Sequence, residues 1–304
     1  MRLLRAELLR ARSRRSVLIV ALAGLLLAIG LGAASAWQSR PYSAEETSRA
    51  ENAATAQVER CKEQAEKHDD TTRRCEMRAH AWLYDRWRDP LDDQVVEEET
   101  VAASLSLTLV SGLLGALLIG GEFTSGSLSN LLLFEPRRTR IWLAKLSATG
   151  ILALLWAALC IGGYVATLTA LGRSWDPGAW PPNWIAAMIG LGVRSAIVIA
   201  VAAVIAAAVT LAVRSTLATL GVSIAYVLVV EGIARIAFTS TVAEYALSSQ
   251  LLGVLYGSHR IEVSSGGQFV YEHVTLQDSA LVLLGVCVAV AAVSLLTFRR
   301  RDVA

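Results

Sequence analysis

Charged residues are scarce in this sequence. Asp, Glu, Lys and Arg make up 18% of its 304 residues, whereas hydrophobic residues make up 54%, and the mean hydropathy is +0.49. About a quarter of the residues are charged in an average soluble domain. The shortage of charge therefore predicts a membrane protein, for which we expect no nucleic-acid partner.

Lysine is rarer still, with only Lys62, Lys67 and Lys145 in the chain. The segment 121–127 has the glycine spacing of a phosphate-binding loop. However, Ser127 stands where that loop requires lysine, and an apolar run precedes it in place of a strand. The chain is therefore not expected to hydrolyse ATP by itself.

Other catalytic patterns are missing as well. All four histidines lie outside the apolar runs, and none has a partner at metal-ligand spacing. We found no nucleophile elbow and no convincing Cys–His pair. The sequence therefore predicts no enzyme, no catalytic residue, no metal site and no cofactor bound by this chain.

Long apolar segments dominate instead. About 20 apolar residues cross a hydrocarbon core of about 30 Å, and the backbone polar groups inside lipid must be satisfied within the segment, which favours helices. We expect an all-α polytopic membrane protein with six transmembrane helices, at residues 16–36, 101–121, 146–171, 184–213, 216–237 and 279–298.

Basic residues alternate between the segments that join these runs. Six arginines precede the first run, and others follow the second, fourth and sixth, including Arg137, Arg138 and Arg214. Because Lys and Arg gather on the cytoplasmic side, both termini are expected to be cytoplasmic. The cytoplasmic parts would be residues 1–15, 122–145 and 299–304, and the external parts residues 37–100 and 238–278, in the cell membrane.

The amino-terminal residues allow more than one interpretation. Arg14-Arg15 and Ala34-Ser35-Ala36 resemble parts of an export signal, but the apolar run between them is longer than that of a cleavable signal. We expect an uncleaved anchor. Before it, Leu4, Leu8 and Ala11 share one face of a possible interfacial helix; a simple basic tail is the alternative.

A short amphipathic pattern follows the second apolar run. Leu128, Leu131 and Leu132 recur at i, i+3 and i+4, Gly126 can open a helix, and Pro136 can end it. A helix of about eight residues is not stable alone and needs a surface to lie against. An ordinary cytoplasmic loop is the alternative interpretation.

This segment, in its place between the second and third spans, resembles that of ABC-2 type permeases, the membrane subunits of ATP-binding-cassette transporters. The resemblance covers nearly the whole chain in span order and implies the ABC-2 (type V exporter-like) fold, here with a helical extracellular insertion at residues 37–100. The matching features are Glu122, Gly126, the pair Leu131-Leu132, Pro136, Arg137, Arg138, Lys145 and the ending 298–303.

The resemblance implies that the segment is a coupling helix, which docks on a separate ATPase subunit. Two copies of that subunit would bind ATP and Mg²⁺, and a second permease copy or a close paralogue would complete the pathway in the lipid. The expected function is ATP-driven export of a lipophilic or amphipathic substrate, such as a lipid, peptide, antibiotic or glycan. The implied ATPase-coupling residues are Glu122, Gly126, Leu128, Leu131, Leu132, Pro136, Arg137 and Arg138.

A second hypothesis has the same spans serve a different purpose. The external domain would bind a ligand or a partner protein, and the ATPases would transmit force without moving a substrate. ATP-dependent accumulation of a substrate in vesicles would distinguish transport from this sensor function.

Three charged residues interrupt the later spans, namely Arg194, Glu231 and Arg235. Charges at mid-bilayer are costly and usually face protein or water, so these residues are candidates for a pathway or gate. The alternative is a structural clasp, or a span that ends before Glu231.

The external segments carry two further patterns. Cys61 and Cys75 flank His68, and a turn there would let them form a disulfide in an oxidising compartment; two free thiols are the alternative. Residues 241–256 are expected to form a short helix, and residues 260–274 a β-hairpin around Gly266-Gly267.

Overall fold

A computed structural model describes residues 2–41, 43–68, 93–134, 137–175, 184–234, 245–265 and 268–300. The helices, in chain order, are α1 (Arg2–Ser13), α2 (Arg15–Gln38), α3 (Ala44–His68), α5 (Asp93–Thr124), α6 (Ser127–Phe134), α7 (Arg138–Trp175), α8 (Trp184–Val213), α9 (Thr216–Tyr226), the π-helical segment η1 (Val227–Ala234), α12 (Leu247–Tyr256) and α13 (Leu276–Arg300). Two strands, β1 (Ser258–Ser265) and β2 (Gln268–Thr275), lie between α12 and α13.

Within the described residues, six helical segments are long and apolar enough to cross a membrane. They are α2, α5, α7, α8, α9 continued by η1, and α13. The prediction of six spans is therefore confirmed, and the chain is a multi-pass membrane protein. Several helices extend beyond the apolar runs; α7, for example, begins at Arg138, eight residues before its predicted span. Apolar run length reports the part of a helix inside lipid, whereas the helix itself continues until a cap or a breaker ends it.

The centre of the bundle is the contact between α5 and α8, with α7 against α8 and α2 against α7. Small polar residues form this contact: Ser104 Oγ donates to Ser195 Oγ at 2.8 Å, and Ser111 Oγ donates to the carbonyl of Ile199 at 2.7 Å. Gly115 lies directly against the backbone of Ala203. Between helices in lipid, close packing and hydrogen bonds replace the hydrophobic effect, so small residues hold the core together.

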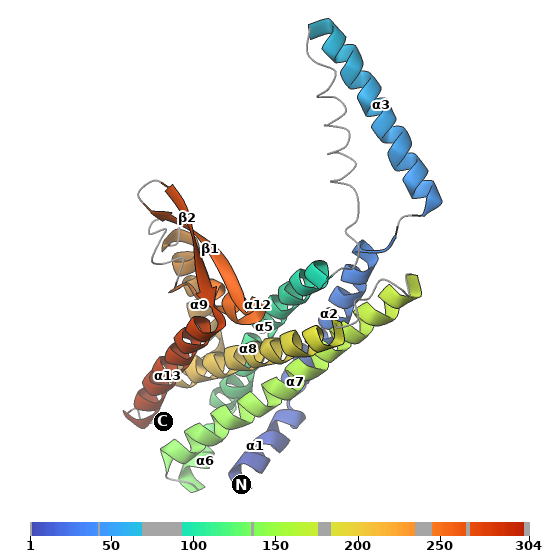
Figure 1. Ribbon diagram of the computed structural model, residues 1–304. Coiled ribbons are helices and arrows are strands. Elements are labelled where there is room, and N and C mark those ends of the chain that lie inside the picture. The colour runs from blue at the N-terminus through green and yellow to red at the C-terminus, as the bar shows by residue number, and fades with distance from the viewer. Residues whose placement is uncertain are drawn as a thin grey trace.

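The two ends of the bundle differ in what they carry. Figure 1 shows α1, α6 and the last turns of α13 at one end, which we call the α6 end. Helix α3 projects from the opposite end, which we call the α3 end. The two ends of the chain therefore lie at the same end of the bundle, as an even number of spans requires.

Three tryptophans gather toward the α3 end. Trp37 and Trp175 meet edge to face with ring centroids 6.1 Å apart, and the Arg40 guanidinium lies 4.3 Å from the Trp37 ring. Arg173 lies 5.8 Å from the ring of Trp184. Tryptophan and arginine together favour the boundary between lipid and water, so this layer marks one face of the membrane.

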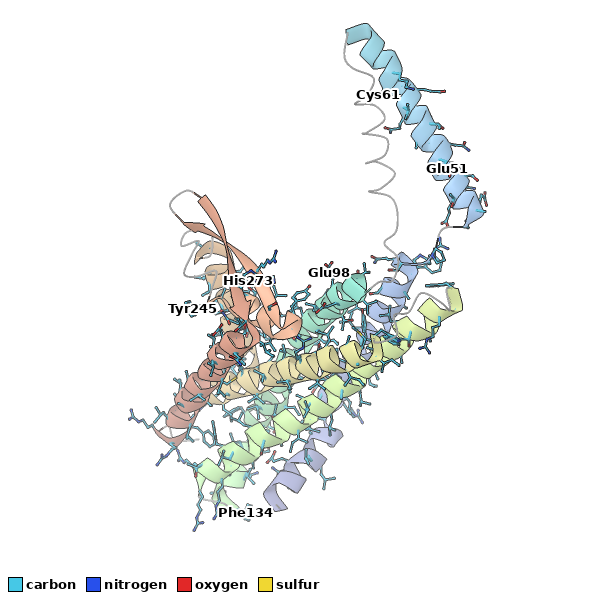
Figure 2. The ribbon with its side chains drawn as sticks, viewed as in Figure 1. Glu51, Cys61, Glu98, Phe134, Tyr245 and His273 are labelled. Atoms are coloured by element: carbon cyan, nitrogen blue, oxygen red, sulfur yellow. The ribbon has the colours of Figure 1, made fainter. Side chains whose placement is uncertain are left out.

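Helix α3 begins with a capping box. Ser43 Oγ accepts from the Glu46 amide at 3.2 Å, and the Glu46 carboxylate accepts from the Ser43 amide at 2.9 Å. Figure 2 shows Cys61 on this helix. Cys75 and residues 69–92, which include the second half of the expected helical hairpin, lie outside the described residues, so the disulfide stays a prediction.

The β-hairpin is confirmed. Strands β1 and β2 pair antiparallel from Ser258 opposite Thr275 to Ser265 opposite Gln268. Helix α12 precedes them and packs against α13, α8 and α5. The short helix expected within residues 241–256 is thus present from Leu247 to Tyr256.

Candidate functional site: a buried charge network at the α6 end

Four charged side chains meet where α1, α2, α5 and α7 come together. Glu7 lies on α1, Arg14 is the N-cap residue of α2, Glu122 lies on α5 and Lys145 on α7. The side chains of Lys145 and Glu122 are 1% and 4% exposed. Because the surrounding helices shield these side chains from water, each charge needs an opposite partner inside the protein.

The network is continuous through hydrogen bonds. The ammonium group of Lys145 donates to Glu122 and, at 3.2 Å, to Glu7. Arg14 donates to the other oxygen of Glu122 at 2.9 Å and to the carbonyl of Leu118. Glu7 also accepts from Arg10 of its own helix at 3.3 Å. Two carboxylates therefore face three cations, of which Arg10 is 43% exposed. Each buried charge has an opposite partner, which offsets its desolvation.

A small cavity adjoins the network. Its volume is about 20 Å³, and its lining includes Glu7, Arg14, Glu122, Lys145 and Thr149. Such a space suits about one water molecule and is far too small for a nucleotide or a transported substrate. The arrangement therefore fastens helices to one another and is not a substrate pocket.

The sequence analysis found only half of this network. Glu122 and Lys145 were among the features of the family resemblance, whereas Glu7 and Arg14 were not singled out as site residues. A signal was present, because Glu7 is the single acidic residue in the arginine-rich helix α1. The face expected to carry Leu4, Leu8 and Ala11 also includes Glu7: Ala11 and Glu7 are each 7% exposed, whereas Leu9, which lies off that face, is 63% exposed. The pairing of Glu7 with Lys145, 138 residues away, adds a charged contact to this face.

Helix α6 has the length and bounds that its sequence predicts. Leu128 is 1% exposed and packs in a core with Ile141 and Phe298, and Leu131 packs at its edge. Leu128 therefore holds α6 against its own bundle, and its expected part in coupling stays a prediction. The side chain of Leu132 lies outside the described part of the structure.

Among the described side chains of α6, Leu133 and Phe134 are apolar and exposed. They are 82% and 88% exposed, and Figure 2 shows Phe134 at the outermost part of the α6 end. Sequence periodicity missed them, because it detects the buried face of a helix and these two residues lie off that face.

The remaining residues of the segment serve the turn and the neighbouring helix. Gly126 has φ of 66°, the left-handed conformation that lets α5 turn into α6. Arg137 is exposed, and Arg138 donates to the carbonyls of Phe298 and Arg299 at 3.4 and 3.2 Å, which caps the C-terminus of α13. Pro136 lies outside the described residues.

Arg194 and Glu231 of the candidate gate are not brought together. Glu231 accepts hydrogen bonds from the amide and hydroxyl of Ser248 at 3.0 and 2.6 Å, at the start of α12. Arg194 lies beside Gly257, at the opposite end of α12. Arg235 lies outside the described residues. For Glu231, this geometry is that of a clasp on α12.

Other reactive groups lie apart from the network. Burial raises the pKa of Tyr256, and the carboxylates of Glu98 and Glu97 raise it further, which keeps the phenol protonated at neutral pH. The described residues contain no group of three or more His, Cys, Asp or Glu side chains able to hold a metal ion.

Comparison with protein families identifies a matching family. Residues 93–304 match the model of the family described as "Protein of unknown function (DUF2705)". The chain belongs to the DUF2705 family. The matched part of this DUF2705 protein begins with α5 and contains Glu122, Lys145 and α6, whereas α1, α2 and α3 precede it. No curated protein matches the chain.

Proposed function

We propose that this DUF2705 protein is the permease subunit of an ABC-2 type exporter in the cell membrane. Its α6 end would face the cytoplasm and bind an ATPase subunit. The observation that carries the proposal is the position of α6: a short helix between the second and third spans, fixed by one face to the bundle and exposing Leu133 and Phe134 at the other.

The charge network connects α6 mechanically to other helices of the bundle. Glu122 precedes α6 and Lys145 follows it, and their ion pair closes the loop that carries the helix. Glu7 and Arg14 extend that closure to α1 and α2. A force applied to α6 would therefore move four helices together, which is the rigid-body motion that alternating access requires.

The proposal implies further components. Two ATPase subunits would bind ATP and Mg²⁺, and a second permease, identical or closely related, would complete a pathway surrounded by lipid. The substrate class we propose is lipophilic or amphipathic.

The test uses the ATPase that co-purifies with the tagged chain. We expect the double variant Leu133→Asp/Phe134→Asp to lose at least about tenfold in bound ATPase and in ATP hydrolysis, because a buried apolar anchor contributes about 2 kcal/mol to an interface. Asn130→Asp adds a charge at an exposed position of the same helix and is the control. Undiminished hydrolysis by the double variant, or hydrolysis by the purified chain alone, would contradict the proposal.

A sensor is the second candidate, favoured by one feature. Helix α3 extends away from the bundle on the α3 end (Figure 1), as a receptor for a ligand or a partner protein would. Reconstituted vesicles separate the two functions: ATP-dependent accumulation of a labelled amphipathic substrate indicates export, whereas hydrolysis stimulated by an external partner without flux indicates a sensor.

A further inference from the structure

Arg194 is a cation within the fourth span, on α8. It lies ten residues after Trp184, or about 15 Å along the helix. Its side chain is half-buried, and in the part of the chain that the structure describes it forms no ion pair and donates no hydrogen bond. A charged residue at this depth is costly and normally faces a partner.

The acidic residue of the candidate gate is engaged elsewhere. Glu231 accepts from Ser248 at the beginning of α12, whereas Arg194 lies at the end of that helix. The carboxylates of Glu97 and Glu98 raise the pKa of Tyr256, and neither forms an ion pair with Arg194. The counter-charge is therefore missing from the described chain.

Glycines make room for polar groups beside α12. Gly257 has φ of 80°, and a β-carbon there would lie only 2.7 Å from Nη1 of Arg194. One turn earlier, the hydroxyl of Ser279 lies directly against Gly253. Gly253 lies in the last turn of α12 and Gly257 is the C-cap residue, so the guanidinium and this hydroxyl both lie beside the C-terminal end of α12.

Two hydroxyl groups beside α12 lack hydrogen-bond partners. Ser249 lies one turn before Gly253, and the Oγ atoms of Ser249 and Ser279 make no hydrogen bond within the described residues. Both residues are buried, at 1% and 0% exposure. Hydroxyl groups in such places normally find a partner, so this seam leaves the hydrogen-bonding capacity of two hydroxyls unused.

We propose that this seam, formed by Arg194, Ser249, Ser279 and the two glycines, binds the anionic headgroup of an amphipathic molecule, with phosphate as the favoured chemistry. A guanidinium binds two phosphate oxygens at once, and weak hydration suits it to a site within the membrane. The Arg194 side chain is partly exposed. The inference goes beyond the proposed function and does not rest on it, because ligand binding is measured on the chain alone.

The experiment measures lipid retained by the full-length chain after purification. The probes are spin-labelled phosphatidylglycerol and spin-labelled phosphatidylcholine in nanodiscs, with inorganic phosphate as a competitor. We expect retention of phosphatidylglycerol over phosphatidylcholine, about tenfold lower retention in Arg194→Gln, and most of the retention kept in Arg194→Lys. Arg173→Gln, which removes a cation near Trp184 at the same end of the bundle, should leave retention unchanged.

Each outcome of this experiment either supports or overturns the proposed anion site. Loss of lipid retention only with Arg194→Gln supports a lipid headgroup, and displacement of the lipid by inorganic phosphate supports a water-borne anion in the same seam. Equal retention by wild type and Arg194→Gln overturns the site. If Arg194→Gln fails to fold, a wild-type chain that prefers neither phosphatidylglycerol nor phosphate overturns it equally.

Discussion

Lys145 shows how a single residue can hold several helices. Its ammonium group lies between Glu122 and Glu7, and 1% of its side chain is exposed. A buried lysine is tolerated only while its charge is matched, so each carboxylate that pairs with it contributes through the charge it balances as well as through its own contact.

Neutralising Glu122 should therefore be costly. In Glu122→Gln, Lys145 keeps only Glu7, and Arg14 loses its carboxylate. We expect the free energy of unfolding to fall by about 3 to 5 kcal/mol, the usual effect of breaking a buried ion pair. Thermal unfolding of the purified protein in detergent measures the change. Glu45→Gln, which removes an exposed pair with Arg49 on α3, is the matched control and should change stability by about 0.5 kcal/mol or less. Equal effects of the two variants would show that the network does not stabilise the fold.

Neutralising Glu7 should have a more local effect. Lys145 retains Glu122 in Glu7→Gln, but α1 loses its ion pair with the bundle. We expect α1 to detach, which a spin label on Leu9→Cys would report as increased mobility, because this position is already exposed. Arg15→Gln changes an exposed charge nearby and is the control. Unchanged mobility in Glu7→Gln would mean that other contacts hold α1.

At the level of elements, the contact between α5 and α8 depends on the absence of a side chain. Gly115 lies against the backbone of Ala203, which cannot rotate away, whereas a β-carbon at Gly112 would meet nothing within 4 Å. Two glycines three residues apart on one helix thus have opposite tolerance for a methyl group.

The pair provides a direct test of the packing. Gly115→Ala should destabilise the protein by about 1 to 3 kcal/mol, because the two helices must move apart. Gly112→Ala should be neutral or slightly stabilising, because alanine favours helix over glycine. The comparison is made by thermal unfolding in the same detergent. Equal losses in the two variants would contradict the close approach of α5 and α8.

Helix α6 illustrates a limit of periodicity. Its bounds follow from Gly126 and from local helix propensity, and they were predicted correctly. The pattern of leucines also identified a face that needs burial. It did not say against what, and the answer is the chain's own core at Phe298 and Ile141, which leaves Leu133 and Phe134 for a partner.

For the whole molecule, the separation of α3 from α6 makes a prediction about sidedness. Figure 2 labels Glu51 on α3 and Phe134 on α6, at opposite ends of the bundle. In a chain without native cysteines, we expect Glu51→Cys to react with a membrane-impermeant maleimide in intact cells, and Phe134→Cys only after permeabilisation. The reason is the excess of arginine at the α6 end.

Other labelling patterns are informative. Reaction of Phe134→Cys in intact cells would reverse the proposed orientation and with it the ATPase-binding role of α6. Reaction of both positions from the same side would contradict the arrangement of spans between them.

The sequence by itself determined the number of spans, their approximate positions, α6 and the hairpin. Lipid sets these features through local rules, because a span must be apolar over about 20 residues and must satisfy its own backbone. Only the tertiary structure decided that Glu7 meets Lys145, that Leu128 faces inward, and that Arg194 and Glu231 lie at opposite ends of α12. Lipid and protein interior are equally apolar, so hydropathy does not report which side of a span faces its neighbours; that choice comes from small residues and paired charges on helices far apart in the chain.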